Sequence, residues 1–100
     1  NMRNDVCTLI GLIVQESKVT RVEKEIYCRR KSSTRSEFYS AYAVGLRPKF
    51  LFEIDPFDWE AVVEQLPEGT GPTILRYGKM EYNILRGYQT DESTLELTVG

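Results

Sequence analysis

The sequence predicts a mainly β domain, namely a small antiparallel β-barrel or sandwich of about six strands with one or two short helices. Three observations predict this class. Several short segments rich in β-branched and aromatic residues alternate between apolar and polar positions. Turn signals separate these segments at close spacing. The chain has 100 residues and is 41% apolar, which suffices for one modest core. We therefore expect a single domain over residues 1–100.

The first two strands are expected at Val6–Val14 and Val22–Lys31. Val6–Val14 also fits a helical stripe, but its β-branched residues, its glycine and its length favour a strand that is buried on both faces. Val22–Lys31 alternates more regularly, with Val22, Ile26 and Cys28 on one face. It is expected to be half-exposed and to end in a basic cluster at residues 29–31.

A short helix is predicted at about residues 35–43. Thr34 and Glu37 have the spacing of a capping box, and an apolar stripe follows them. Gly45 is suited to the C-terminal cap, and Pro48 blocks continuation of the helix.

A second helix is predicted at about residues 56–65. Asp55 is suited to the N-cap and Pro56 to the first helical position. Apolar residues follow at helical spacing from Trp59 to Leu66. A twisted strand is the rival interpretation, because Val62 and Val63 also suit a sheet.

A hairpin is predicted around a two-residue loop, Gly78–Lys79, with the glycine first as in a type II′ turn. This register places Tyr77 opposite Met80, Leu75 opposite Tyr82, and Arg76 opposite Glu81, the last as a favourable cross-strand pair. The remaining assignments are a strand at Lys49–Ile54, a loop at Leu66–Pro72, a connection at Gly87–Ser93 and a final strand at Leu95–Val99.

Charge is distributed unevenly along the chain, although the net charge is only −2. Residues 1–50 carry ten Lys or Arg against five Asp or Glu, and residues 51–100 carry three against ten. One interpretation is chance and solvated surface. The other is a protomer with a basic face that meets an acidic face of its neighbour.

The composition argues against an enzyme. The chain has no His, which removes the commonest general base and metal ligand. Cys7 and Cys28 lie in apolar runs and are expected to be small buried hydrophobes in a reducing environment, without a disulfide. The acidic residues around Trp59 are expected to cap the second helix rather than to bind a cation. We predict no catalytic residue, no cofactor and no metal site.

No membrane segment or signal peptide is expected. The apolar run after Arg3 is too short to span a bilayer and lacks a small-residue cleavage site. Asn1 before Met2 is interpreted as a cloning remnant, with Met2 as the natural start.

The residues match a known family at several points. A basic stretch follows Cys28, then comes Thr34-Arg35-Ser36-Glu37-Phe38-Tyr39, then Gly45-Leu46-Arg47-Pro48, and then an alternating strand. This pattern resembles the head-closure, or head–tail joining (head–tail adaptor), proteins of tailed phages and prophages of Gram-positive bacteria. The resemblance covers roughly residues 6–99. Gly78–Lys79 and the longer segment 61–73 depart from the family pattern, and the first departure admits a bulge in the late hairpin.

The resemblance implies a structural role in the virion neck. Members of the family are small β-barrels that form a ring beneath the portal and adaptor after DNA packaging. They close the DNA exit channel and offer a docking surface to the tail. The implied partners are portal, adaptor and tail-completion proteins, further copies of the chain in a ring, and packaged DNA nearby. The implied locations are the head–tail interface of the virion and, during assembly, the bacterial host cytoplasm.

The resemblance also implies an adaptable segment near residues 30–49 that contacts other protomers or changes conformation. The residues expected at this interface are Arg30, Lys31, Arg35, Ser36, Glu37, Tyr39, Tyr42 and Arg47. The alternative function, from the residues themselves, is a small barrel that binds single-stranded nucleic acid through this basic and aromatic region.

Overall fold

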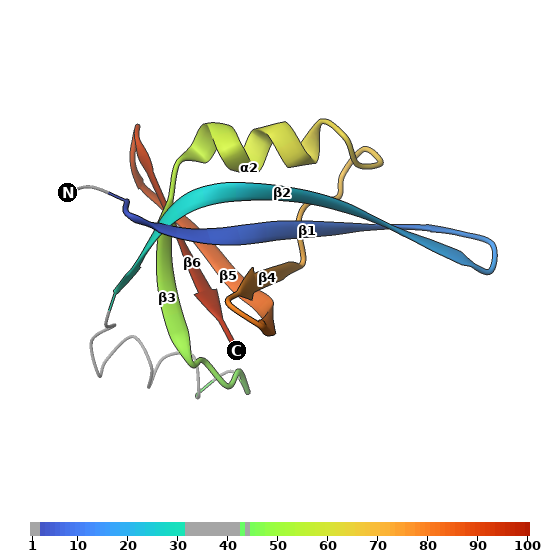
Figure 1. The fold of residues 1–100 in the computed structure, drawn as a ribbon. Helices are drawn as coiled ribbons and strands as arrows, with labels where there is room; N and C mark the ends of the chain where they lie inside the picture. The colour runs from blue at the N-terminus through green and yellow to red at the C-terminus, as the bar shows by residue number, and fades with distance from the viewer. Residues whose placement is uncertain (1–2, 32–42, 44) are drawn as a thin grey trace.

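The computed structural model describes residues 3–31, 43 and 45–100. The strands form a closed antiparallel barrel in the order β1-β2-β3-β6-β5-β4, with one helix placed against it (Figure 1). The elements are β1 (Asp5–Gln15), β2 (Lys18–Lys31), β3 (Phe50–Ile54), α2 (Pro56–Val63), β4 (Ile74–Tyr77), β5 (Met80–Asp91) and β6 (Thr94–Val99). This confirms the predicted mainly β class with about six strands, and of the two predicted architectures it is the barrel.

The barrel closes around an apolar core drawn from every strand. Closure occurs where β4 pairs with β1, Ile10 lying opposite Ile74. The completely buried side chains include one or more from each of β1, β2, β3, β4, β6 and α2: Leu9, Ile10, Cys28, Phe52, Ile54, Val62, Leu75, Leu97 and Val99. Leu9 and Ile10 are consecutive and therefore point to opposite faces of β1. The prediction that this strand is buried on both faces is confirmed at its centre.

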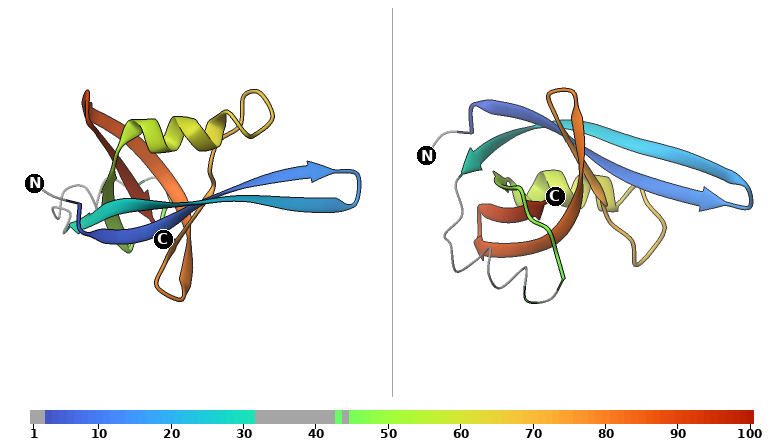
Figure 2. Two further views of the ribbon diagram at one scale, coloured as in Figure 1. Left: turned by 45° about the horizontal axis from the view of Figure 1, so that its top comes forward. Right: turned by 90° about the horizontal axis from the view of Figure 1, so that it is seen from below.

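Strands β1 and β2 form one long hairpin whose far end projects from the barrel as an arm (Figures 1 and 2). Pairing is regular from Asp5 opposite Cys28 to Gln15 opposite Lys18. Glu16 takes a positive φ of 54° in the two-residue turn. The predicted start of the second strand at Val22 was too late, because hairpin pairing continues to Lys18 after the core contacts have ended.

Helix α2 forms where the second helix was predicted, and the strand alternative is wrong. The Asp55 side chain accepts a hydrogen bond from Phe57 N at 2.9 Å, and Pro56 occupies the first turn. Val62 enters the core from this helix. The α-helix ends at Val63 rather than at residue 65, and a tighter turn carries Leu66 onto the backbone of β1 at Gly11.

The β4–β5 hairpin has the predicted register. Tyr77 lies opposite Met80 and Arg76 opposite Glu81, and Gly78 has a φ of 63°. A positive φ at the first loop residue, with none at Lys79, is the signature of a type II′ turn. The departure from the family pattern at Gly78–Lys79 allowed for a bulge in this hairpin, but the pairing of β4 with β5 is regular. Register shifts occur instead between β5 and β6, at Ile84/Arg86 and Gln89/Asp91.

Two predictions concern the remaining segments. The predicted connection Gly87–Ser93 is wrong over most of its length, because β5 continues to Asp91 and pairs there with Thr94 of β6. Glycine and polar residues are weak strand formers, and pairing with β6 overrides that preference. The helix predicted at about 35–43 lies outside the described residues, except for Ala43.

Candidate functional site

The residues predicted to form an interface divide into two groups. Arg30, Lys31 and Arg47 are described, whereas Arg35, Ser36, Glu37, Tyr39 and Tyr42 lie outside the described residues. Arg47 is exposed and donates a hydrogen bond to the carbonyl of Leu46 at 3.2 Å. Arg30 and Lys31 are consecutive at the end of β2 and therefore lie on opposite faces of it.

Lys31 is held by carboxylates of the same chain. Its Nζ lies 3.3 Å from Glu53 Oε2 on β3 and 2.8 Å from Glu96 Oε2 on β6. Glu53 and Glu96 are paired in register, and both side chains are mostly buried. The hydrogen bond to Glu96 raises the pKa of Lys31, so the ammonium stays charged. Lys31 thus joins three strands, and its charge is balanced within the barrel.

Arg30 lies over an aromatic cluster at the end of the barrel. Its guanidinium carbon is 5.0 Å from the Phe50 ring centroid and 5.7 Å from that of Tyr77. Tyr82 packs edge-on against Phe50 at 5.4 Å. Arg30 itself remains exposed. Among the described residues of the predicted interface, Arg30, stacked on aromatic rings, and Arg47 are exposed.

Four charged side chains from β2, β4 and β5 form a closed ring of ion pairs on the outer face of the barrel. This quartet consists of Arg21, Glu23, Arg76 and Glu81. Arg76 lies 2.7 Å from Glu23 and 3.2 Å from Glu81, and Arg21 lies 2.8 Å from Glu81 and 3.9 Å from Glu23. Because β1 separates β2 from β4, the Arg76–Glu23 pair crosses over β1 beside Ile10. Hydrogen bonds from Arg76 and Arg21 lower the pKa values of Glu23 and Glu81, respectively.

These ion pairs account for part of the charge asymmetry along the sequence. Lys31 and Arg21, from the basic half, bind Glu96 and Glu81, from the acidic half. In the barrel order β1 and β2 are adjacent, and β3, β6, β5 and β4 follow together, so these ion pairs join the β1–β2 hairpin to strands of the acidic half. Both cations are paired within the chain, and the hypothesis that a basic face meets an acidic face of a neighbouring copy stays a prediction.

The two cysteines are free, buried and adjacent inside the barrel. Cys7 lies opposite Ile26 and Cys28 opposite Asp5, so the two thiols are diagonal neighbours on one face of the hairpin. The hydrogen bond with Cys28, followed by burial, holds the pKa of Cys7 well above its ordinary value. Both residues are the small core hydrophobes that the sequence predicted, and Cys7 is a poor nucleophile.

Of the acidic residues near Trp59, Asp55 caps the helix, as predicted. Asp58 lies in the first turn of α2, where burial and the nearby Asp55 raise its pKa. Within the described ranges, no group of three or more potential metal ligands is present. In the same ranges, no helix is long and apolar enough to cross a membrane.

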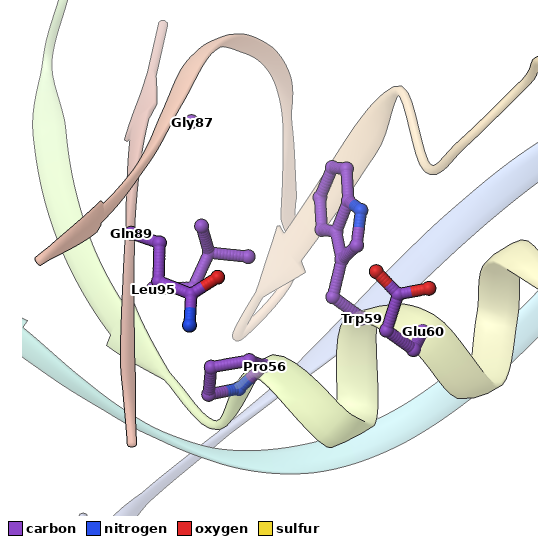
Figure 3. Close-up of a pocket in the computed structure, with 6 residues that line it drawn as sticks. All are labelled: Pro56, Trp59, Glu60, Gly87, Gln89 and Leu95. Atoms are coloured by element: carbon purple, nitrogen blue, oxygen red, sulfur yellow. The ribbon is translucent and has the colours of Figure 1, made fainter. Parts of the chain in front are cut away.

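A pocket of about 340 Å³ lies between α2 and the β5–β6 hairpin (Figure 3). Pro56, Trp59 and Glu60 line it from the helix, and Gly87, Gln89 and Leu95 line it from the hairpin. In the close-up, the Leu95 and Gln89 side chains extend into the space beside Pro56 and Trp59. Sequence reasoning missed this site, because it assigned Gly87 and Gln89 to a connection.

The arm is the second feature that the sequence did not reveal. Val14 and Val19 face each other near its tip and are 66% and 58% exposed. The signal for it is the pair of valines flanking the polar turn at residues 15–18.

Comparison of the chain with protein-family models, curated proteins and solved structures finds no match.

Proposed function

We propose that this protein is a structural component of a phage neck, which joins head to tail and closes the DNA exit channel by assembling as a ring under the portal and adaptor. The proposal rests on the resemblance carried by residues 28–48 and on one architectural observation. The segment that carries most of that resemblance is inserted between β2 and β3 of a closed barrel. Segments that connect the strands of a scaffold commonly carry the residues that bind other molecules.

The surroundings of this insertion support the proposal. Arg30 and Phe50 flank it at the end of β2 and the start of β3 and stack on each other, at 5.0 Å. Aromatic residues and arginine are enriched where protein interfaces contribute most to affinity. The chain is acidic overall, and Lys31 and the arginines of the quartet are paired internally, so a ring around DNA would adhere weakly to its phosphates.

The test is to mix the labelled chain with a purified portal–adaptor complex of its phage and to image the particles. We expect labelled density in a ring below the adaptor. Arg30→Glu should reduce incorporation severalfold, whereas Lys79→Glu, with the same charge change at the exposed β4–β5 turn, should not. A folded chain that never joins the neck at high concentration contradicts the proposal.

A small barrel that binds single-stranded nucleic acid is the second candidate, and the half-buried aromatic cluster under the exposed Arg30 is the observation that favours it. Titration with single- and double-stranded DNA at two salt concentrations separates the candidates. Tight binding that weakens steeply with salt supports the nucleic-acid role. Weak binding at both concentrations supports the neck role.

A further inference from the structure

Strand β5 has a free edge over its second half. On one side β6 pairs with it as far as Asp91. On the other side β4 pairs only with Met80–Asn83, and Ile84 N donates to Thr73 O at 2.9 Å. From residue 85 to 91 no described residue pairs with that side. A row of unpaired backbone N–H and C=O groups is a template for another extended chain.

The pocket lies over the face of β5 and β6 that carries Gly87, Gln89 and Leu95, next to this free edge. Gly87 and Gln89, from the unpaired half of β5, form one wall, and Trp59 of α2 stands opposite (Figure 3). Gly87 contributes no side chain that would fill the space. A strand edge beside a helix, with a pocket between them, is the arrangement by which several domains bind extended peptides. In that mode backbone hydrogen bonds provide affinity, and pockets for alternate side chains provide specificity.

The chemistry of the groove favours an apolar side chain with a cation close to it. Pro56, Trp59 and Leu95 are apolar, and the charged lining residue is Glu60. Further carboxylates lie on α2, at its C-cap and at the tip of the β5–β6 hairpin, namely Asp58, Glu64, Asp91 and Glu92. Arg86 alternates with Gly87 and so lies on the opposite face of β5. Arg3, the cation at the hairpin tip, is bound to Ser93 and Thr94.

We propose that the groove between β5 and α2 binds an extended, basic and apolar peptide segment of a partner protein. The segment adds as a strand to β5 over residues 85–91 and places an apolar side chain against Trp59. A Lys or Arg two positions along the segment lies on the same face and pairs with Glu60. This site does not depend on the neck role, because its test uses the isolated chain.

The test uses the fluorescence of Trp59, which is the only tryptophan of the chain. The probe is the peptide acetyl-Ser-Lys-Thr-Leu-Thr-Lys-Ser-amide, whose Leu and two Lys share one face when it is extended. We expect a saturable change in Trp59 emission and shifts of the backbone amide signals of residues 85–91. Two control peptides carry Glu in place of Lys, or N-methyl groups that block strand pairing, and each should bind about tenfold more weakly.

Matched variants of the full chain locate the cation site. Glu60→Lys should weaken binding of the Lys-containing peptide about fivefold and should improve binding of the Glu-containing peptide. Glu68→Lys, with the same charge change in the exposed loop after α2, should leave both affinities within about twofold. Amide spectra of each variant check that the barrel is folded.

Three outcomes overturn the site: no change in Trp59 emission at millimolar peptide, equal binding of the N-methylated peptide, or no effect of Glu60→Lys. Failure here and failure of the neck role are distinguishable. A chain that binds the peptide but never joins the neck retains this site and loses the proposed function. A chain that joins the neck but does not bind the peptide retains the proposed function and loses this site.

Discussion

At the scale of single residues, Gly11 allows the turn after α2 to pack closely on β1. The side chain of Leu66 packs directly on its backbone, and a Cβ built at Gly11 would lie 2.8 Å from Leu66 Cδ2. Gly11 is buried, and Leu66 is itself only 8% exposed, so little room exists for it to move away. Glycine in the middle of a strand usually weakens it, but here its missing side chain lets Leu66 pack against the β1 backbone.

We expect Gly11→Ala to lower the free energy of unfolding by about 1–3 kcal/mol, because the added methyl group overpacks the contact with Leu66. Gly87→Ala is the matched control, since a Cβ there meets Leu97 at an ordinary 3.4 Å. Urea denaturation of both variants makes the measurement. Equal stability of the two variants contradicts this account of Gly11.

The charged quartet predicts that the free energy of unfolding decreases at acidic pH. The pKa values of Glu23 and Glu81 are lowered in the folded chain by hydrogen bonds from Arg76 and Arg21, respectively. Below the ordinary glutamate pKa of 4.5 the unfolded chain therefore binds more protons than the folded chain. The stabilisation is complete above that pH and is lost as the pH falls through the folded values.

We therefore expect the urea midpoint to fall between pH 7 and pH 3.5, and Glu23→Gln and Glu81→Gln to reduce that fall. Glu25→Gln, on the same strand as Glu23 but outside the quartet, is the control. High salt should weaken the effect, because the four side chains are partly exposed to solvent, between 32% and 43%. If the urea midpoint falls by the same amount in all three variants, the quartet is not the source of the pH dependence.

At the scale of elements, the arm and the barrel are separable parts of one hairpin. From Val14 to Arg21 every residue is exposed, whereas Ile13 and Val22 pack against the core. Ile13 and Thr20 face each other in register, so a two-residue turn can join them directly.

Replacing residues 14–19 by Asn-Gly should change the free energy of unfolding by less than about 1 kcal/mol, because the removed residues contribute little to the core. Chemical denaturation and an amide spectrum of the shortened chain are the measurements. A large loss of stability would contradict the view that the arm is separable from the barrel.

At the scale of the whole molecule, closure makes the last strand indispensable. β6 joins β3 to β5 and contributes Leu97 and Val99, both completely buried. Removing it would open the barrel and expose two strand edges together with the core. Since first and last elements share one core, we expect a single cooperative unfolding transition.

Deletion of residues 94–100 should abolish that transition and leave a chain without dispersed amide signals. The arm-shortened chain, in which two residues replace six of the β1–β2 hairpin, is the control and should retain both. A cooperative transition in the chain without β6 would contradict the closed barrel.

The sequence by itself determined the features that depend on neighbouring residues. Alternation in Val22–Lys31 predicted which face of that strand is buried. The Asp55 cap with Pro56 predicted the helix, and the Gly78–Lys79 turn predicted the register of its hairpin. Each depends on local backbone geometry, so a few adjacent residues suffice to predict it. The resemblance to head-closure proteins also comes from the sequence alone, and the neck role remains a prediction.

Only the tertiary structure decided which distant residues meet. Barrel order brings Lys31 to Glu96, and the quartet closes across β1. The groove exists because β4 ends where β5 continues, which leaves an edge beside Trp59. Strand ends at Lys18 and Asp91 likewise extend beyond the sequence signal, because pairing with a neighbouring strand outweighs weak local preference. Such contacts depend on the order and length of strands far apart in the chain, which local patterns do not encode.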